Sequence, residues 1–95
     1  MEVEVVRRGG FAGLTLRGVA DTSELSPAAA GKAEAALREL PFARPPSPPR
    51  HPDSFQFEIT VRDGDARRSV LLDEADLPEG LRPVIEAAVS RGNLE

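Results

Sequence analysis

The sequence of 95 residues contains no cysteine, tryptophan or tyrosine, and it has a single histidine, His51. Without cysteine there is no disulfide, no thiolate zinc site and no thiol nucleophile. A Ser-His-Asp arrangement would need His51, which lies in a proline-rich segment that offers no scaffold for a productive geometry. A zinc site would rest on carboxylates with at most one imidazole. We therefore predict that the protein is not an enzyme and has neither metal nor cofactor.

Long apolar runs and massed positive charge are also missing. No apolar run approaches the roughly 20 residues that span a bilayer, and no basic-then-apolar leader follows Met1. The 12 Lys and Arg residues are scattered among 16 Asp and Glu residues, giving a net charge of -4. We expect a cytoplasmic monomer that binds neither membrane nor nucleic acid.

The length predicts one small domain without a deep enclosed site, because a chain of this size buries only about 60% of its unfolded surface. We place this single domain at residues 1–93. Leu94 and Glu95 are interpreted as a remnant of a vector-encoded tag and receive no functional weight.

The first third of the chain predicts a hairpin followed by a helix. Residues 2–5 and 14–17 alternate polar and apolar side chains and should pair as two antiparallel strands. Ser26 and Pro27 then supply an N-cap and a first helical residue. Apolar residues follow at helical spacing up to Pro41, which ends the helix. They are Leu25, Ala29, Ala33, Ala36, Leu37 and Leu40.

A proline-rich connector occupies residues 41–53 and contains six of the nine prolines. Each proline removes a backbone donor and favours an extended residue before it, so neither a helix nor a central strand should form. We expect a flexible, disordered connector whose first end is pinned to the core by Phe42. A proline-rich ligand for an aromatic groove is the alternative interpretation.

The second half repeats the plan of the first. Residues 55–62 alternate with Phe55, Phe57, Ile59 and Val61 on one face, a turn follows at residues 63–65, and residues 68–72 return antiparallel. A second helix should begin near Pro78 or Pro83 and end before Gly92. Its apolar stripe is Leu77, Leu81, Val84, Ile85, Ala88 and Val89.

Both halves also share an Asp four residues before a Leu, ahead of a proline-initiated helix. Asp21 and Leu25 correspond in this way to Asp73 and Leu77. The acidic residues before the second helix are thus better explained by helix capping than by a metal site. The sequence predicts an α+β fold in ββα-ββα order, with an antiparallel four-stranded sheet and both helices on one face.

The candidate binding residues are Arg8, Gly9, Gly10, Phe11, Ala12 and Gly13, between the first two strands. A phosphate-binding loop would lead into a helix and carry a Lys, and this segment does neither. Glycines permit positive φ angles and let the backbone approach a partner, while Phe11 could fill a partner's pocket. The alternative is that Phe11 folds back and caps the end of the sheet.

The start of the chain, from Val3 through the Gly-Gly-Phe-Ala-Gly pentad at residues 9–13, resembles the emfourin family of small bacterial proteins. The residues around Asp21, the proline-rich middle, the 55–61 strand and the helix near Leu77 are similar too. The resemblance implies an α+β inhibitor of protealysin-like and thermolysin-like zinc metallopeptidases. It also implies that residues 8–13 contact the protease cleft, with Arg8 standing where family members often have serine.

Two alternatives remain open on the residues alone. One is a non-inhibitory interaction module that regulates another neighbouring enzyme. The other is a small-ligand binding protein that uses the open end of the sheet.

Overall fold

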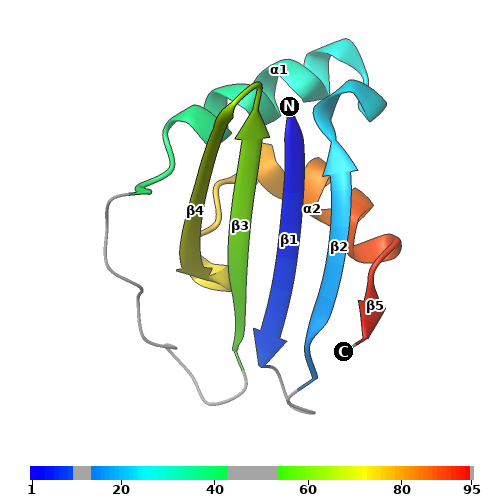
Figure 1. Cartoon of the computed structure of the whole chain (residues 1–95), viewed down its shortest axis with the longest axis vertical. Helices are drawn as coiled ribbons and strands as arrows, with labels where there is room; N and C mark the ends of the chain where they lie inside the picture. Colours follow the sequence, from blue (N-terminus) through cyan, green and yellow to red (C-terminus); the bar gives the residue numbers. More distant parts are fainter. Residues whose placement is uncertain (10–13, 43–53, 95) are drawn as a thin grey trace.

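The computed structural model describes residues 1–9, 14–42 and 54–94, which form five strands and two α-helices (Figure 1). The strands are β1 (Glu2–Gly9), β2 (Leu16–Asp21), β3 (Phe55–Asp63), β4 (Ala66–Asp73) and β5 (Asn93–Leu94). The helices are α1 (Pro27–Arg38) and α2 (Arg82–Ser90). Three 3₁₀ turns precede them, η1 (Thr22–Glu24), η2 (Glu74–Asp76) and η3 (Glu79–Leu81). The α+β class is confirmed, and so is the ββα-ββα order up to α2.

The sheet has the order β4-β3-β1-β2-β5, and every neighbouring pair is antiparallel. The prediction of four strands was wrong, because the chain after α2 adds β5 to the edge of β2. Leu94, interpreted above as part of a tag remnant, is paired there with Leu16. A two-residue strand has no alternation to read in a sequence, so its partner alone defines it.

The first hairpin is longer on its first strand than the sequence indicates. β1 continues past the expected Val5 to Gly9, whereas β2 starts at Leu16 rather than Leu14. Val6 and Arg7 pair with both β2 and β3, and the last two residues of β1 pair with β3 alone, as far as Gly9 opposite Phe55. The glycine-rich pentad therefore begins inside a strand, and its residues 10–13 lie outside the described residues.

The repeated Asp-to-Leu spacing has the same structural role in both halves. Asp21 ends β2 and accepts a hydrogen bond from the Ser23 N–H, which caps η1. Asp73 ends β4 and accepts one from the Ala75 N–H, which caps η2. Leu25 and Leu77 are the C-cap residues of these two turns. The capping explanation of the acidic residues is confirmed for Asp73.

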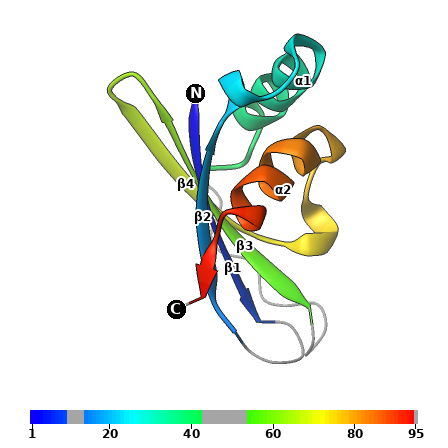
Figure 2. The ribbon, with the colours of Figure 1, turned by 90° about the vertical axis from the view of Figure 1, so that its right-hand side faces the viewer.

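Both helices cover one face of the sheet, as predicted (Figure 2). Ser26 caps α1 through the Ala29 N–H, with Pro27 at its first position. α2 begins at Arg82, the later of the two predicted starts. Gly18 lets α2 approach β2 closely, because a Cβ there would lie 1.9 Å from the Ala88 carbonyl oxygen.

A single apolar core lies between the sheet and the helices. The predicted inward face of β3 is confirmed, with Phe57, Ile59 and Val61 buried and Phe55 half-buried. Phe42 packs against this core, as expected for the first end of the connector. The core comprises Val3, Val5, Ala20, Ala33, Leu37, Leu40, Phe57, Ile59, Val61, Val70, Leu72, Leu81, Val84, Ile85 and Ala88.

Candidate protein-binding end of the sheet

The structure places the candidate residues at the end of the sheet where β1 finishes. Arg8 and Gly9 are the last two residues of β1. Gly10, Phe11, Ala12 and Gly13 lie outside the described residues, and the chain is described again from Leu14. The described part of the candidate site is thus the base that leads into residues 10–13, which we call the glycine-rich segment (Figure 1).

Gly9 is fixed by a backbone conformation and a contact that only glycine allows. Its φ angle is +88°, in the left-handed region that side chains disfavour. A Cβ at this position would lie 2.8 Å from the carbonyl oxygen of Ser54, the residue that precedes β3. The buried Ser54 therefore packs directly against the end of β1. This contact fixes the position of Gly9 relative to the start of β3.

Two further contacts fix the same base. The guanidinium carbon of Arg7 lies 4.4 Å from the centre of the Phe55 ring, a cation-π contact across β1 and β3. The Phe55 N–H donates to the Glu74 carboxylate at 3.2 Å, which ties the start of β3 to η2. The strand end that carries Gly9 is held by its neighbours on β3, and β3 is held in turn by η2.

Arg8 presents a cation on the face of the sheet away from the helices. Its guanidinium lies 3.8 Å from the Glu58 carboxylate of β3, and its side chain is 48% exposed. An exposed pair at this distance contributes little to stability, roughly 0–1 kcal/mol. The guanidinium can exchange Glu58 for a carboxylate on a partner at small cost.

The end of β1 also has one unpaired side. The register of β1 with β2 stops at Arg7 opposite Leu16, whereas its register with β3 continues to Gly9. On the side of Arg8 and Gly9 away from β3, no strand pairs with them among the described residues. Leu14 lies two residues before β2, is 52% exposed and adds apolar surface next to that strand.

The sequence proposed Arg8 and Gly9 as binding residues, which stays a prediction, and it gave no signal for the residues that hold them. The contacts of Arg7 with Phe55 and of Gly9 with Ser54 depend on the register between β1 and β3, which a pattern of residues does not state. Glycines permit positive φ angles, and Gly9 adopts one in the structure.

Metal-binding clusters and membrane-spanning helices are both absent from the described part of the chain. Within the residues that the structure describes, no group of three His, Asp or Glu side chains is placed to hold a metal ion. None of the described helices is both long and apolar enough to cross a bilayer. This end offers a partner the main chain of Arg8 and Gly9, the Arg8 guanidinium and the apolar surface of Leu14.

Comparison with known proteins adds one match. The family model Emfourin matches residues 5–88, which is most of the chain and includes the whole candidate segment. The chain belongs to the emfourin family. Emfourins are an inhibitor family, so membership implies the general role of a metalloprotease inhibitor with a metallopeptidase as protein partner. The curated proteins and the solved structures that were searched gave no match.

Proposed function

We propose that this emfourin inhibits a thermolysin-like zinc metallopeptidase by placing residues 8–13 in the catalytic cleft of the enzyme. The observation that carries the proposal is the anchoring of Gly9 against Ser54 at the end of β1. A segment that leaves a fixed strand end loses less conformational entropy on binding than a segment on a loose base. Family membership supports the class of partner.

The backbone of Arg8 and Gly9 would lie along the cleft as an added strand. Its support is the register of β1, which extends two residues beyond its pairing with β2. Extended segments commonly bind proteins through main-chain hydrogen bonds along such a side, with alternate side chains supplying specificity.

Phe11 would fill the apolar pocket that thermolysin-like enzymes use for the residue after the scissile bond. A phenylalanine side chain buried in a partner contributes on the order of 2 kcal/mol. Leu14, which is exposed, would extend the apolar contact beyond the glycines. Inhibition would occur by occlusion rather than by chelation, since residues 8–13 contain no carboxylate, imidazole or thiolate to bind zinc.

Resistance to cleavage would follow from the hairpin. Six residue pairs join β1 to β2, from Glu2 opposite Asp21 to Arg7 opposite Leu16. A cut within residues 8–13 would leave both new ends attached to the sheet. The cleaved segment would stay in the cleft, and the peptide bond would re-form more readily than the ends would separate.

The monomeric state and the cytoplasmic location expected from the sequence belong to the same proposal. Mixing the purified protein with each of several thermolysin-like proteases and separating every mixture by size tests the monomeric state and the proposed complex. We expect a complex of one copy of each chain. A protein that forms no complex with any such protease would favour the alternative of a non-inhibitory interaction module.

A further inference from the structure

A second feature lies at the opposite end of the sheet. A cleft of about 170 Å³ opens between the C-terminal end of α1 and the β3–β4 hairpin. Its apolar walls are the side chains of Met1, Leu37, Phe42 and Val61, of which Leu37 and Val61 are buried. Charged groups at its rim come from Arg38 of α1, Asp63 of β3 and Arg68 of β4.

The walls of the cleft are held in place by backbone contacts. The Met1 carbonyl oxygen accepts a hydrogen bond from the Thr22 N–H at 2.9 Å. The Phe42 N–H donates to the Leu40 carbonyl oxygen at 2.9 Å, which turns Phe42 back over the end of α1. Val61 lies on β3, an interior strand, and is paired with both β1 and β4. The cleft is therefore formed before any ligand arrives.

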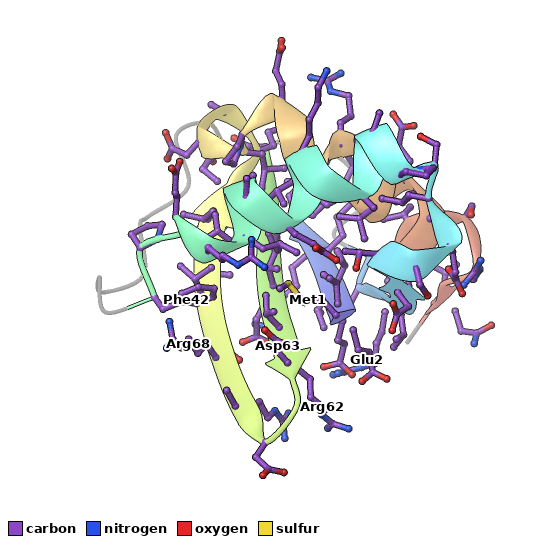
Figure 3. All side chains as sticks on the ribbon, turned by 90° about the horizontal axis from the view of Figure 1, so that it is seen from above. Met1, Glu2, Phe42, Arg62, Asp63 and Arg68 are labelled. Atoms are coloured by element: carbon purple, nitrogen blue, oxygen red, sulfur yellow. The ribbon has the colours of Figure 1, made fainter. Side chains whose placement is uncertain are left out.

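The three charged groups at the rim lack ionic partners in the described parts of the chain. No carboxylate of residues 1–9, 14–42 or 54–94 lies within ion-pair distance of Arg38 or Arg68, and no cation lies within that distance of Asp63. The Arg68 guanidinium carbon lies 5.9 Å from the Phe42 ring centre, which keeps it over the apolar wall. In contrast, Arg62 and Glu2 pair with each other at 3.7 Å on the face away from α1 (Figure 3).

Size and charge together indicate the ligand. A cavity of about 150 Å³ accommodates a benzene molecule, so this cleft suits one apolar side chain and excludes a nucleotide. Two guanidinium groups bind a carboxylate with charge-assisted hydrogen bonds, and a single carboxylate such as Asp63 binds an ammonium group. An apolar body with one carboxylate and one ammonium group is a free apolar α-amino acid.

We propose that the cleft binds a free apolar α-amino acid such as leucine. Its side chain lies on Leu37, Val61 and Phe42. Arg38 and Arg68 hold its carboxylate, and Asp63 holds its ammonium group. Met1, Phe42, Asp63 and Arg68 lie around the space between α1 and the hairpin when the molecule is viewed from above (Figure 3).

This site is separate from the proposed protease contact. β1 runs from Glu2 beside the cleft to Gly9 at the other end of the sheet, and eight strand residues span about 25 Å. Binding of the amino acid therefore does not depend on the proposed inhibitor function, and each proposal can fail without the other.

The first test compares ligands by amide chemical-shift titration of the untagged ¹⁵N-labelled protein at pH 7. Leucine should shift the amides of Phe42, Asp63 and Arg68. N-acetyl-leucine lacks the ammonium group, leucine amide lacks the carboxylate, and glycine lacks the side chain. Each should bind at least about tenfold more weakly, as expected when one charged or apolar contact is lost. Equal binding of leucine and both blocked forms, or no shift of these amides by leucine, would overturn the proposal.

The second test pairs each variant of a cleft residue with a control variant of a nearby residue outside the cleft. Arg68→Gln should weaken leucine binding at least about tenfold, whereas Arg67→Gln on the opposite face of β4 should leave it unchanged. Asp63→Asn should remove the preference for leucine over N-acetyl-leucine. Asp65→Asn, a change in the adjacent turn outside the cleft, should preserve that preference. All four residues are exposed, so the variants should fold. Equal effects within either pair would contradict the assignment.

Discussion

The Gly9 Cα faces the Ser54 carbonyl oxygen so closely that an added Cβ would lie 2.8 Å from it. Ser54 is buried and directly precedes β3, so an added Cβ would have to displace main-chain atoms. The contact joins the end of β1 to the start of β3 at the base of the glycine-rich segment. The proposed inhibitory segment therefore depends on the backbone conformation of Gly9.

Gly9→Ala should reduce both stability and inhibition. Alanine at φ +88° carries backbone strain of about 1–2 kcal/mol, and the contact with Ser54 adds to it. We expect a loss of about 2–4 kcal/mol in the free energy of unfolding, measured by urea denaturation. Inhibition of the target protease should weaken by more than the unfolded fraction explains.

Gly64→Ala is the matched control for this change. Gly64 has a φ angle of +62° in the β3–β4 turn, but a Cβ there would meet no atom within 4 Å. The variant should lose about 1 kcal/mol and inhibit normally. If Gly64→Ala and Gly9→Ala lowered inhibition equally, the base of the glycine-rich segment would not be the binding end.

Arg8→Ala should slow association with the protease while leaving the fold intact. The 3.8 Å pair with Glu58 is exposed, so the free energy of unfolding should change by less than about 0.5 kcal/mol. Loss of a rim charge should lower the association rate severalfold at low salt and less at high salt. Stopped-flow inhibition at two salt concentrations measures this effect.

Arg62→Ala provides the comparison. Arg62 forms a similarly exposed pair with Glu2 at 3.7 Å, on the same face of the sheet but at its other end. The association rate of the Arg62→Ala variant with the protease should equal that of the unaltered protein. A decrease as large as that of Arg8→Ala would mean that net charge, rather than the position of Arg8, controls association.

The sequence predicted the elements that rely on local patterns. Alternation in residues 2–5 and 55–62 gave the inward faces of β1 and β3, and apolar spacing gave α1 and α2. It missed β5 because two residues carry no period, and β5 exists only through its pairing with β2. It also ended β1 too early, since the last residues of β1 pair with β3 far away in the chain.

The candidate site was predicted in the same uneven way. Three closely spaced glycines and an aromatic residue pointed to residues 8–13, and Gly9 has the positive φ that such a pattern favours. The contacts with Ser54, Phe55 and Glu74 come from the tertiary register and had no signal in the sequence. The binding role of residues 8–13, that of Phe11 included, stays a prediction.

Gly31→Ala should stabilise the protein. Gly31 lies inside α1, and a Cβ there would meet nothing within 4 Å. Alanine restricts the unfolded chain and favours the helix, so the free energy of unfolding should rise by about 0.5–1 kcal/mol. Gly80→Ala serves as the control, because its Cβ would lie 3.0 Å from the Lys32 carbonyl oxygen. Thermal melting should show a gain for the first variant and none for the second.

Acid should remove a link between η1 and the end of α2. The Glu24 carboxylate lies 2.6 Å from the Arg91 guanidinium, and this partner lowers the pKa of Glu24 from its ordinary value of 4.5. A carboxylate whose pKa is lower in the folded than in the unfolded protein stabilises the fold at pH values above its ordinary pKa. That stabilisation is lost as the pH falls through the pKa of the folded state. The free energy of unfolding should therefore decline below about pH 4.5.

Glu24→Gln should flatten part of this decline, as measured by denaturation between pH 3 and pH 7, roughly the window in which carboxylates titrate. Glu86→Gln, on the exposed side of α2, is the control and should keep the slope of the unaltered protein. An identical pH dependence in the Glu24 variant and the unaltered protein would show that the Arg91 pair does not contribute.

The most direct measurement is the residual activity of thermolysin-like metallopeptidases titrated with this protein and with its Phe11→Ala variant. The account predicts stoichiometric loss of activity with at least one enzyme. It also predicts inhibition at least about tenfold weaker for Phe11→Ala, largely restored in Phe11→Leu. No inhibition of any enzyme in the panel, or undiminished inhibition by a folded Phe11→Ala variant, would contradict it.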